Sequence, residues 1–381
     1  MKVPPAAIHF PEQDRRWILE QIEECLVTGA LTLGKHGKAL EDSFAERCRC
    51  SYAVAVNSGT SALEIILRAI GVKGREVIVP TNTFFATPAA VLHSGGLVRF
   101  ADCDRRDFAI DTASIQDCLG PQTAAVIVVH IGGIISPRID EIRNACDAAG
   151  VPLIEDAAHA HGSALGARPA GSFGRAAAFS FYPTKVMTSG EGGIIVTNDE
   201  GLYREAVLYR DQGKEGFTTN FHVRLGYNWR MSEPHAIIGL AQLRRLDEFI
   251  QRRREIAQVY DRLLPRLGRT LVPVEPSPGA HSNYYKYIAM LNGMERPALK
   301  QMMREKFEVG LSGEVYEVPC HLQPVFQKCA AGPLPKAENI CANHVCLPVS
   351  ARMTQAEARY VVDCLEEATS SLRAQPVRAG D

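Results

Sequence analysis

Short apolar runs alternate with amphipathic stretches through the first two thirds of the chain. The runs predict strands at residues 54–56, 76–79, 97–100, 124–130, 152–154 and 177–181. The stretches between them have helical periodicity; over residues 139–149, for example, Ile142, Cys146 and Ala149 fall on one face. Alternation of this kind is typical of βαβ units, so we expect an α/β fold with a mostly parallel central sheet flanked by helices.

The pattern changes after residue 233. Residues 236–264 predict one long helix, continuous or broken once, whose basic run at residues 252–254 we expect to be a solvated face. A proline-rich stretch at residues 273–278 then leads into a smaller α+β region. Because 381 residues exceed what one hydrophobic core usually supports, we expect more than one domain. The predicted division is an N-terminal segment packing with the small domain (1–35), a large domain (36–245) and a small C-terminal domain (246–381).

Composition narrows the class of protein. The formal net charge of −1 argues against a general nucleic-acid or membrane surface. Eleven cysteines include no C-x-x-C pair, and there is no apolar run of membrane-spanning length, so we expect reduced thiols in a soluble cytoplasmic protein. Cys341, His344 and Cys346 lie close together, but a second ligand pair at zinc-finger spacing is missing. We therefore predict a packed segment there and no metal site.

The strongest candidate chemistry lies at Ser180-Phe-Tyr-Pro-Thr-Lys185, which runs on to Gly190-Glu-Gly-Gly193. These residues place a lysine just beyond one predicted strand and before another. Packing has little use for a strongly hydrated ammonium. A partly desolvated lysine with a lowered pKa is, in contrast, the usual nucleophile toward carbonyls and pyridoxal 5′-phosphate (PLP). The plain alternative for Lys185 is a surface lysine on a loop.

Asp156 is a matching partner for the ring nitrogen of PLP. Val151-Pro-Leu-Ile-Glu-Asp156 predicts a buried strand with a carboxylate at its carboxyl end, where open α/β sheets bind ligands. PLP works as an electron sink when its ring nitrogen is protonated, and an adjacent aspartate favours that state. The alternative interpretation of Asp156 is a helix N-cap.

A phosphate cradle is predicted earlier in the chain. A strand at residues 52–56, the turn Asn57-Ser-Gly-Thr60 and a helix over residues 61–70 together offer free backbone N–H groups and a helix N-terminus. No G-x-G-x-x-G follows the strand, so the turn is not a dinucleotide fingerprint.

The motifs now stand in a recognisable order. They are Asn57-Ser-Gly-Thr60, Thr83-Phe-Phe-Ala-Thr87, Glu155-Asp-Ala-Ala-His-Ala-His-Gly162, Ser180-Phe-Tyr-Pro-Thr-Lys185 and Gly226-Tyr-Asn-Trp-Arg-Met231. From about residue 11 to about residue 347 the chain resembles the DegT-type sugar aminotransferases. The resemblance implies PLP fold type I, with a large domain, a smaller α+β C-terminal domain, and PLP that becomes the pyridoxamine form (PMP) in the half-reaction.

The resemblance also implies roles for individual residues. Lys185 resembles the Schiff-base lysine that also moves the proton, Asp156 the ring-nitrogen partner, Phe84 the aromatic over the ring, and His159 the polar residue near the phenolic oxygen. Gly59, Thr60 and Ser180 resemble the phosphate ligands. Asn228 resembles the asparagine that reaches the other subunit's cofactor phosphate, which implies a homodimer with shared active sites. We expect Phe85 and His161 to be core residues.

The substrate is less constrained. The resemblance implies a nucleotide-linked keto-deoxysugar, with dTDP-4-keto-6-deoxyhexose favoured, and an amino-acid donor such as glutamate. Lys35 and His321 are candidate substrate contacts. Many members of the family carry an asparagine directly after the lysine, whereas Val186-Met187 follows it here. We expect this difference to alter the pocket wall near the amine. Alternatives are a keto-cyclitol aminotransferase, a sugar dehydratase, or a non-catalytic PLP-binding regulator; the intact Lys185 argues against the dehydratases, which carry histidine there.

Overall fold

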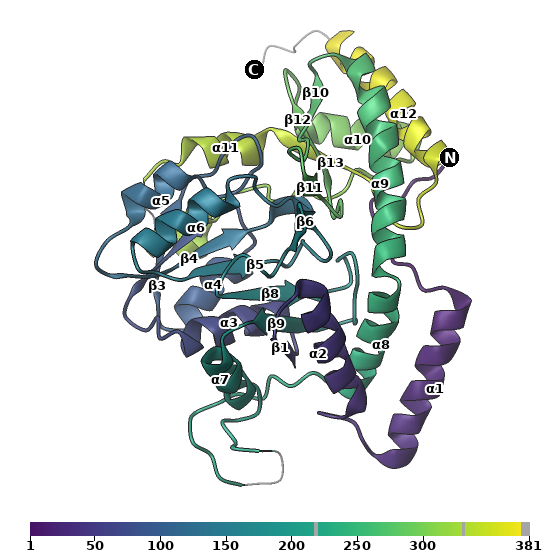
Figure 1. Ribbon diagram of the computed structural model, residues 1–381. Coiled ribbons are helices and arrows are strands. Elements are labelled where there is room, and N and C mark those ends of the chain that lie inside the picture. The colour runs from purple at the N-terminus through teal and green to yellow at the C-terminus, as the bar shows by residue number, and fades with distance from the viewer. Residues whose placement is uncertain (217–219, 330–331, 375–381) are drawn as a thin grey trace.

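The computed structural model of the protein describes residues 1–216, 220–329 and 332–374. Its centre is a seven-stranded sheet with the strand order β1-β9-β8-β5-β4-β2-β3 (Figure 1). The strands are β1 (Tyr52–Val56), β2 (Glu76–Pro80), β3 (Leu97–Ala101), β4 (Thr123–Val129), β5 (Leu153–Asp156), β8 (Ala176–Ser180) and β9 (Gly193–Thr197). From β8 to β3 neighbouring strands run parallel, whereas β9 is antiparallel to both of its neighbours. The predicted mostly parallel sheet is confirmed.

Helices cover both faces of this sheet, as the uninterrupted burial of β4 requires. Leu40 and Ile142 belong to the core on one face, and Ile66 and Ala206 to the core on the other. The first face carries α2 (Lys35–Cys48), α5 (Thr112–Cys118), α6 (Ile139–Ala148) and α8 (Glu233–Arg244), and the second carries α3 (Gly59–Ala69), α4 (Ala86–His93) and α7 (Glu200–Arg210). The sheet is therefore held rigidly between two apolar layers.

Some predicted boundaries shift in informative ways. The strand predicted at residues 152–154 is β5, which continues to Asp156, so the carboxylate belongs to the last residue of the strand. The helix predicted over residues 236–264 is two helices, α8 and α9 (Leu246–Leu263), which meet at Arg245. The Arg245 guanidinium binds Asp14 of α1 (Glu12–Thr28) at 3.0 Å, which anchors the junction to the N-terminal helix.

The C-terminal region forms a smaller α+β unit, as predicted. Its sheet has the antiparallel order β10-β12-β13, and α9 passes from the large layer alongside it (Figure 1). Its elements are β10 (Leu271–Pro273), β12 (Tyr287–Leu291), α10 (Arg296–Phe307), α11 (Pro335–Ala342), β13 (His344–Leu347) and α12 (Gln355–Ala374). A short sheet of β11 (Ala280–His281), β6 (Ala164–Leu165) and β7 (Arg168–Pro169) connects the two parts.

Arg253 corrects the prediction that residues 252–254 are a solvated helix face. Its side chain is buried, and its guanidinium donates to the carbonyl oxygens of Tyr284 and Val349, both at 3.1 Å. Burial lowers the pKa of Arg253 to about 10. The prediction was wrong because consecutive residues on a helix point in different directions. Arg253 points toward the backbone at Tyr284 and Val349.

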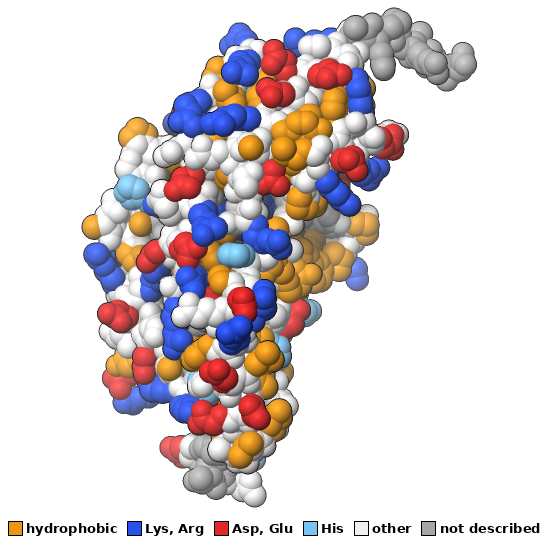
Figure 2. Space-filling model, turned by 90° about the vertical axis from the view of Figure 1, so that its right-hand side faces the viewer, with side chains coloured by type: hydrophobic (Ala, Val, Ile, Leu, Met, Phe, Trp, Pro, Cys, Tyr) orange, Lys and Arg blue, Asp and Glu red, His pale blue; other side chains and the backbone are white. Residues whose placement is uncertain are grey.

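The N-terminal segment contacts both parts of the molecule. Ile18 and Cys25 of α1 pack against α8, whereas Val3 pairs with Val309 in the C-terminal region. The predicted division at residues 35 and 245 stays a prediction. Over the face that carries α1 and α9, acidic and basic side chains are interspersed (Figure 2). Within the described ranges, none of the helices combines the length and the apolar character needed to cross a membrane.

Candidate active site

A cavity of 520 Å³ lies beyond the carboxyl ends of β5 and β8. These two strands are parallel neighbours, with Asp156 opposite Ala178, so the segments that follow them open at one edge of the sheet. Asp156, Lys185 and the turn Gly59-Thr60 all line this cavity. The structure thus brings together three features that lie far apart in the sequence, as expected for a ligand site in an open α/β sheet.

Lys185 has the electrostatic character of a reactive amine. It follows β8, and its backbone N–H donates to the carbonyl oxygen of Tyr182 at 3.0 Å. Burial is the largest cause that lowers the pKa of Lys185, to about 8; the ammonium of Lys286 acts in the same direction and the charge of Asp156 opposes both. A substantial fraction of Lys185 is therefore neutral near pH 8, which is the form that attacks a carbonyl.

Asp156 is a buried and oriented carboxylate. One of its oxygens accepts a hydrogen bond from the Thr87 hydroxyl at 2.7 Å, and the other accepts from the Ala158 backbone N–H at 3.2 Å. Burial raises the pKa of Asp156, while these two bonds and the charge of Lys185 lower it. A further cation beside Asp156 would also oppose the effect of burial, so the site favours a protonated nitrogen there.

The turn before α3 forms a narrow anion cradle. Ser58 caps the helix by accepting from the Ser61 N–H at 3.0 Å, whereas the N–H groups of Gly59 and Thr60 have no hydrogen-bond partner among the described residues. A Cβ added at Gly59 would lie 2.8 Å from the Ser180 Cβ. Only glycine fits this approach, which leaves free N–H groups and the helix dipole facing the cavity.

Aromatic rings line two sides of the cavity. Phe84 is 60% exposed and lines it, at 6.4 Å between ring centres from Tyr316. His159 is buried and stacks on Tyr285 at 4.2 Å, and its Nδ1 accepts from the Gly132 N–H at 3.3 Å. Burial, reinforced by the charge of Lys185, lowers the pKa of His159 well below its usual value, so this ring is neutral.

Phe85 and His161, the two side chains expected in the core, behave differently. His161 is fully buried beside Phe44 and Phe179, which confirms the expectation, and burial lowers its pKa to about 3. Phe85 is 49% exposed and packs at 5.6 Å from Phe326, so the expectation of a core residue was wrong. Position 85 starts a helix at the sheet edge, where only one side of the ring is covered.

Several predicted residues do not line this cavity. Lys35 is exposed at the start of α2 and pairs with Glu24. His321 is buried, with its ring nitrogens bonded to the Thr81 hydroxyl at 2.7 Å and to Glu338 at 3.1 Å. Asn228 is exposed and forms a β-bridge with Asp211. Neither Lys35, His321 nor Asn228 is among the lining residues.

Val186 and Met187 correct the expectation about the pocket wall. Both side chains are buried in the core on the α2 face of the sheet, and neither lines the cavity. The chain turns after Lys185 so that the apolar pair points inward while the lysine points to the cavity. The replacement of the asparagine at this position therefore changes core packing.

The lining residues that come from the smaller C-terminal unit were not predicted from the sequence. They are Tyr285, Lys286, Glu314, Val315 and Tyr316. The hydrogen bond from Thr87 to Asp156 was not predicted either, although Thr87 ends the motif Thr83-Phe-Phe-Ala-Thr87. The one available signal was the lysine within the aromatic run Tyr284-Tyr-Lys-Tyr287, an unusual position for an ammonium at the start of a buried strand.

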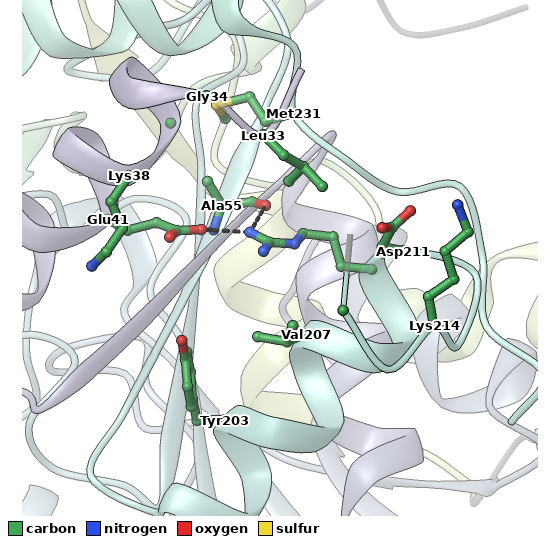
Figure 3. Close-up of a pocket in the computed structure, with 13 residues that line it drawn as sticks. Leu33, Gly34, Lys38, Glu41, Ala55, Tyr203, Val207, Asp211, Lys214 and Met231 are labelled. Atoms are coloured by element: carbon green, nitrogen blue, oxygen red, sulfur yellow. Dashed lines mark hydrogen bonds and ion pairs between the residues drawn. The ribbon is translucent and has the colours of Figure 1, made fainter. Parts of the chain in front are cut away.

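A second cavity of 340 Å³ lies between α2, α7 and the segment after α7 (Figure 3). Three of the charged side chains that line it, Glu41, Arg210 and Asp211, are already paired. Arg210 donates to the carboxylate of Glu41 and to the carbonyl oxygen of Ala55 (the dashed lines that end on Glu41 and Ala55 in Figure 3), and Asp211 pairs with Arg230. We therefore place the candidate chemistry in the cavity that contains Lys185.

Two groups of potential metal ligands have their polar atoms in use. Glu233 lies near Cys25 and His36, and it accepts from the N–H groups of Gly34 and His36 at 3.0 and 2.8 Å, which caps the start of α2. His344 donates from Nδ1 to Ile340 at 2.7 Å and accepts at Nε2 from the Val315 N–H at 3.0 Å. Both arrangements are explained by hydrogen bonding within the fold.

Comparison with known proteins agrees with this geometry. Residues 12–366 match the model of the DegT/DnrJ/EryC1/StrS aminotransferase family. A GDP-perosamine synthase of Caulobacter vibrioides is 32% identical over 368 residues, covering 96% of this chain and 98% of that protein. A UDP-N-acetyl-3-dehydro-alpha-D-glucosamine 3-aminotransferase of Acidithiobacillus ferrooxidans is 34% identical over 345 residues, covering 90% of each chain. The structure of NtdA from Bacillus subtilis with bound PMP is 27% identical, with a TM-score of 0.89, covering 97% of this chain and 85% of that one.

Proposed function

The chain belongs to the DegT/DnrJ/EryC1/StrS aminotransferase family and uses PLP, and from this premise we propose that it transfers an amino group from an amino acid to a keto group of a nucleotide-linked sugar. The observation that carries the proposal is that the Lys185 amine, the Asp156 carboxylate and the Gly59-Thr60 turn line one and the same cavity. Each of the three suits a different chemical group of the cofactor.

The residues of the cavity fit PLP. The cofactor has an aldehyde, a phosphate and a pyridine nitrogen, and the cavity offers an amine with a pKa of about 8, a turn with free N–H groups, and a buried carboxylate. When bound, PLP supplies an electron sink for the carbon that gains or loses the amino group. We assign Gly59, Thr60 and Ser180 to the phosphate.

The remaining chemistry is assigned to four side chains. Lys185 holds the cofactor and moves the proton between the reacting carbon and its own amine. Asp156, held by Thr87, keeps the ring nitrogen protonated. Phe84 covers one side of the ring by stacking. His159, neutral and fixed by Gly132, orients the polar edge of the ring.

The proposed substrates are a keto-deoxysugar on a nucleoside diphosphate and glutamate as the amino donor. We propose dTDP-4-keto-6-deoxyhexose as the first acceptor to test. The names of the relatives, one acting with a GDP-linked and one with a UDP-linked sugar, support the nucleotide-sugar class and make those carriers the competing outcomes.

A substrate panel tests this proposal. The holoenzyme is incubated with glutamate and with 3-keto and 4-keto sugars carried by dTDP, UDP and GDP, and the products are identified by mass. We expect one nucleotide sugar to be converted to its amino form. Conversion of a keto-cyclitol but of no nucleotide sugar would favour the cyclitol alternative, and a yellow protein that accepts no donor would favour a non-catalytic regulator.

We further propose that the enzyme is a homodimer in which Asn228 completes the active site of the other subunit. Asn228 is exposed and is not among the residues that line the cavity of its own chain. The nearby side chains of Val223 and Leu225 are 43% and 94% exposed. Exposed apolar side chains beside a polar residue without a local role are typical of an interaction surface.

Hybrid dimers test the shared site. Lys185→Ala and Asn228→Asp should each be inactive, because the first removes the amine and the second places a negative charge near the cofactor phosphate. In a mixed dimer both lesions fall in one site and the other site is intact. We therefore expect mixing under conditions of subunit exchange to restore part of the activity.

The measurement needs an independent proof that the subunits exchange, for which the mass of the mixed dimer suffices. If hybrids form and activity does not return, Asn228 serves only its own chain. In that case every hybrid site contains one lesion, and the shared-site proposal is wrong.

A further inference from the structure

A second ammonium group lines the cavity that contains Lys185. Lys286 directly precedes β12, its backbone N–H donates to the carbonyl oxygen of Gly132 at 3.2 Å, and its Nζ donates to that of Gly313 at 2.9 Å. The Nζ atoms of Lys185 and Lys286 lie 5.0 and 5.4 Å from the centre of the same ring, that of Tyr285. Burial is the main cause that lowers the pKa of Lys286.

Lys286 has no counter-ion among the described residues. Glu314, which also lines the cavity, is already held by the Lys300 ammonium at 2.7 and 2.9 Å. Asp156 accepts its hydrogen bonds from Thr87 and Ala158. Lys286 is half-buried, and an ammonium partly removed from water without a carboxylate partner does not stabilise a fold. Its presence therefore needs an explanation other than packing.

The bond to Gly313 does not supply that explanation. A carbonyl oxygen accepts equally from a neutral donor, and one such bond uses only one of the three N–H groups of an ammonium. Lys300, in contrast, has the ordinary structural arrangement, because both oxygens of Glu314 face it. The positive charge of Lys286 is therefore directed at something that enters the cavity.

We propose that Lys286 binds an anionic oxygen group of a substrate during amination. The inference rests on the proposed function, which brings two such groups into the cavity: the carboxylate of the amino donor and the diphosphate of the nucleotide sugar. Both accept charge-assisted hydrogen bonds from an ammonium. The partly dry wall formed by Tyr285 and the small sheet strengthens such a bond relative to water.

Equilibrium binding to the holoenzyme tests the proposal. Calorimetric titration of the PLP form of wild type and Lys286→Met with 2-oxoglutarate, and separately with dTDP, UDP and GDP, measures the two kinds of anion without turnover, because the keto acid brings no amino group to transfer. We expect about tenfold to hundredfold weaker binding in at least one arm, the range for one lost charge-assisted bond. A loss confined to 2-oxoglutarate assigns Lys286 to the donor carboxylate, and a loss confined to a nucleoside diphosphate assigns it to the phosphate.

Two further variants separate binding from structural damage. Lys286→Arg keeps the charge and should bind the same anion within a few-fold of wild type. Lys300→Met, the matched lysine, should lower the thermal midpoint because it leaves Glu314 without its main partner, and should leave anion binding unchanged. Lys286→Met should keep the wild-type midpoint or exceed it, because the half-buried ammonium that it removes has no carboxylate partner.

The outcomes against the proposal are specific. Unchanged binding of both kinds of anion in Lys286→Met overturns it. Weaker binding of both kinds together with a lower midpoint or a lower cofactor content also overturns it, because the role of Lys286 would then be structural. A wild-type enzyme that binds PLP and aminates no nucleotide sugar is a failure of the proposed function, which the substrate panel reports before any variant is made.

Discussion

Replacing Lys185 with alanine will abolish turnover while the protein still binds PLP reversibly. Lys185 is the amine with a pKa of about 8 that lines the cavity, and we propose that it attacks the aldehyde and then moves the proton. A positioned general base alone contributes about 100-fold to 10,000-fold to a rate, so the loss should be at least of this size. The turn at Gly59-Thr60, to which we assign the cofactor phosphate, is unchanged in this variant, so we expect PLP still to bind.

Chemical labelling identifies the attached lysine directly. Borohydride reduction of the wild-type holoenzyme followed by peptide mapping should place the label on Lys185. Lys286 is the sharpest competitor, because it lines the same cavity and burial lowers its pKa too. A label on Lys286, or on the more distant Lys214, would overturn the assignment.

The pH dependence of cofactor uptake gives an independent readout. The pKa of Lys185 is lowered, so its amine is protonated and unreactive well below pH 8 and neutral above it. In protein stripped of PLP, the rate of attachment should therefore rise with pH and level off above about pH 8. A rate that continues to rise toward pH 10 would indicate an unperturbed lysine.

Replacing Asp156 with asparagine should slow the half-reaction about 100-fold while PLP remains bound. The amide has nearly the same shape, and its single carbonyl oxygen can still accept from Thr87, so the change removes the charge and the longer hydrogen bond from the Ala158 N–H. Without that charge the ring nitrogen loses its proton more readily. A 100-fold effect corresponds to roughly 2.7 kcal/mol in the barrier, about what a charged hydrogen bond in a buried site contributes.

Thr87→Val is the matched control for Asp156→Asn. It removes the hydroxyl that orients the carboxylate at 2.7 Å but leaves the charge, so its effect on the half-reaction should be smaller, about tenfold. The rates are measured in single-turnover experiments with glutamate, with the cofactor content checked by absorbance. Near-normal turnover of Asp156→Asn would mean that another acid protonates the ring.

The fold class was predictable because it depends on local patterns. Strands covered on both faces appear as continuous apolar runs, and β4 is buried at every position. Asp156 ends the apolar run at residues 151–156, and Lys185 follows the run at residues 177–181. The segments after parallel strands meet at one edge of a sheet, so the two residues were expected to lie close together. The cavity at the ends of β5 and β8 contains both residues.

The errors share one cause, which is the direction in which a single side chain points. Phe84 and Phe85 are adjacent and identical, yet only Phe84 lines the cavity. Val186 and Met187 point into the core rather than to the pocket wall, and Arg253 is buried within a run that is otherwise solvated. No periodicity distinguishes such neighbours, because the answer depends on which distant segment covers each position.

The sequence by itself determined the α/β architecture and the lysine, carboxylate and glycine turn that line the cavity, because each is set by the residues next to it. Tertiary structure alone decided which residues of the C-terminal unit close the cavity. Tyr285, Lys286 and Tyr316 line it, and the segment before β12 is held there by the hydrogen bond from the Lys286 N–H to Gly132, just after β4. The physical reason is that burial of an apolar face is favourable whichever segment covers it. A sequence therefore shows that a face is buried, but it does not show which distant segment buries it.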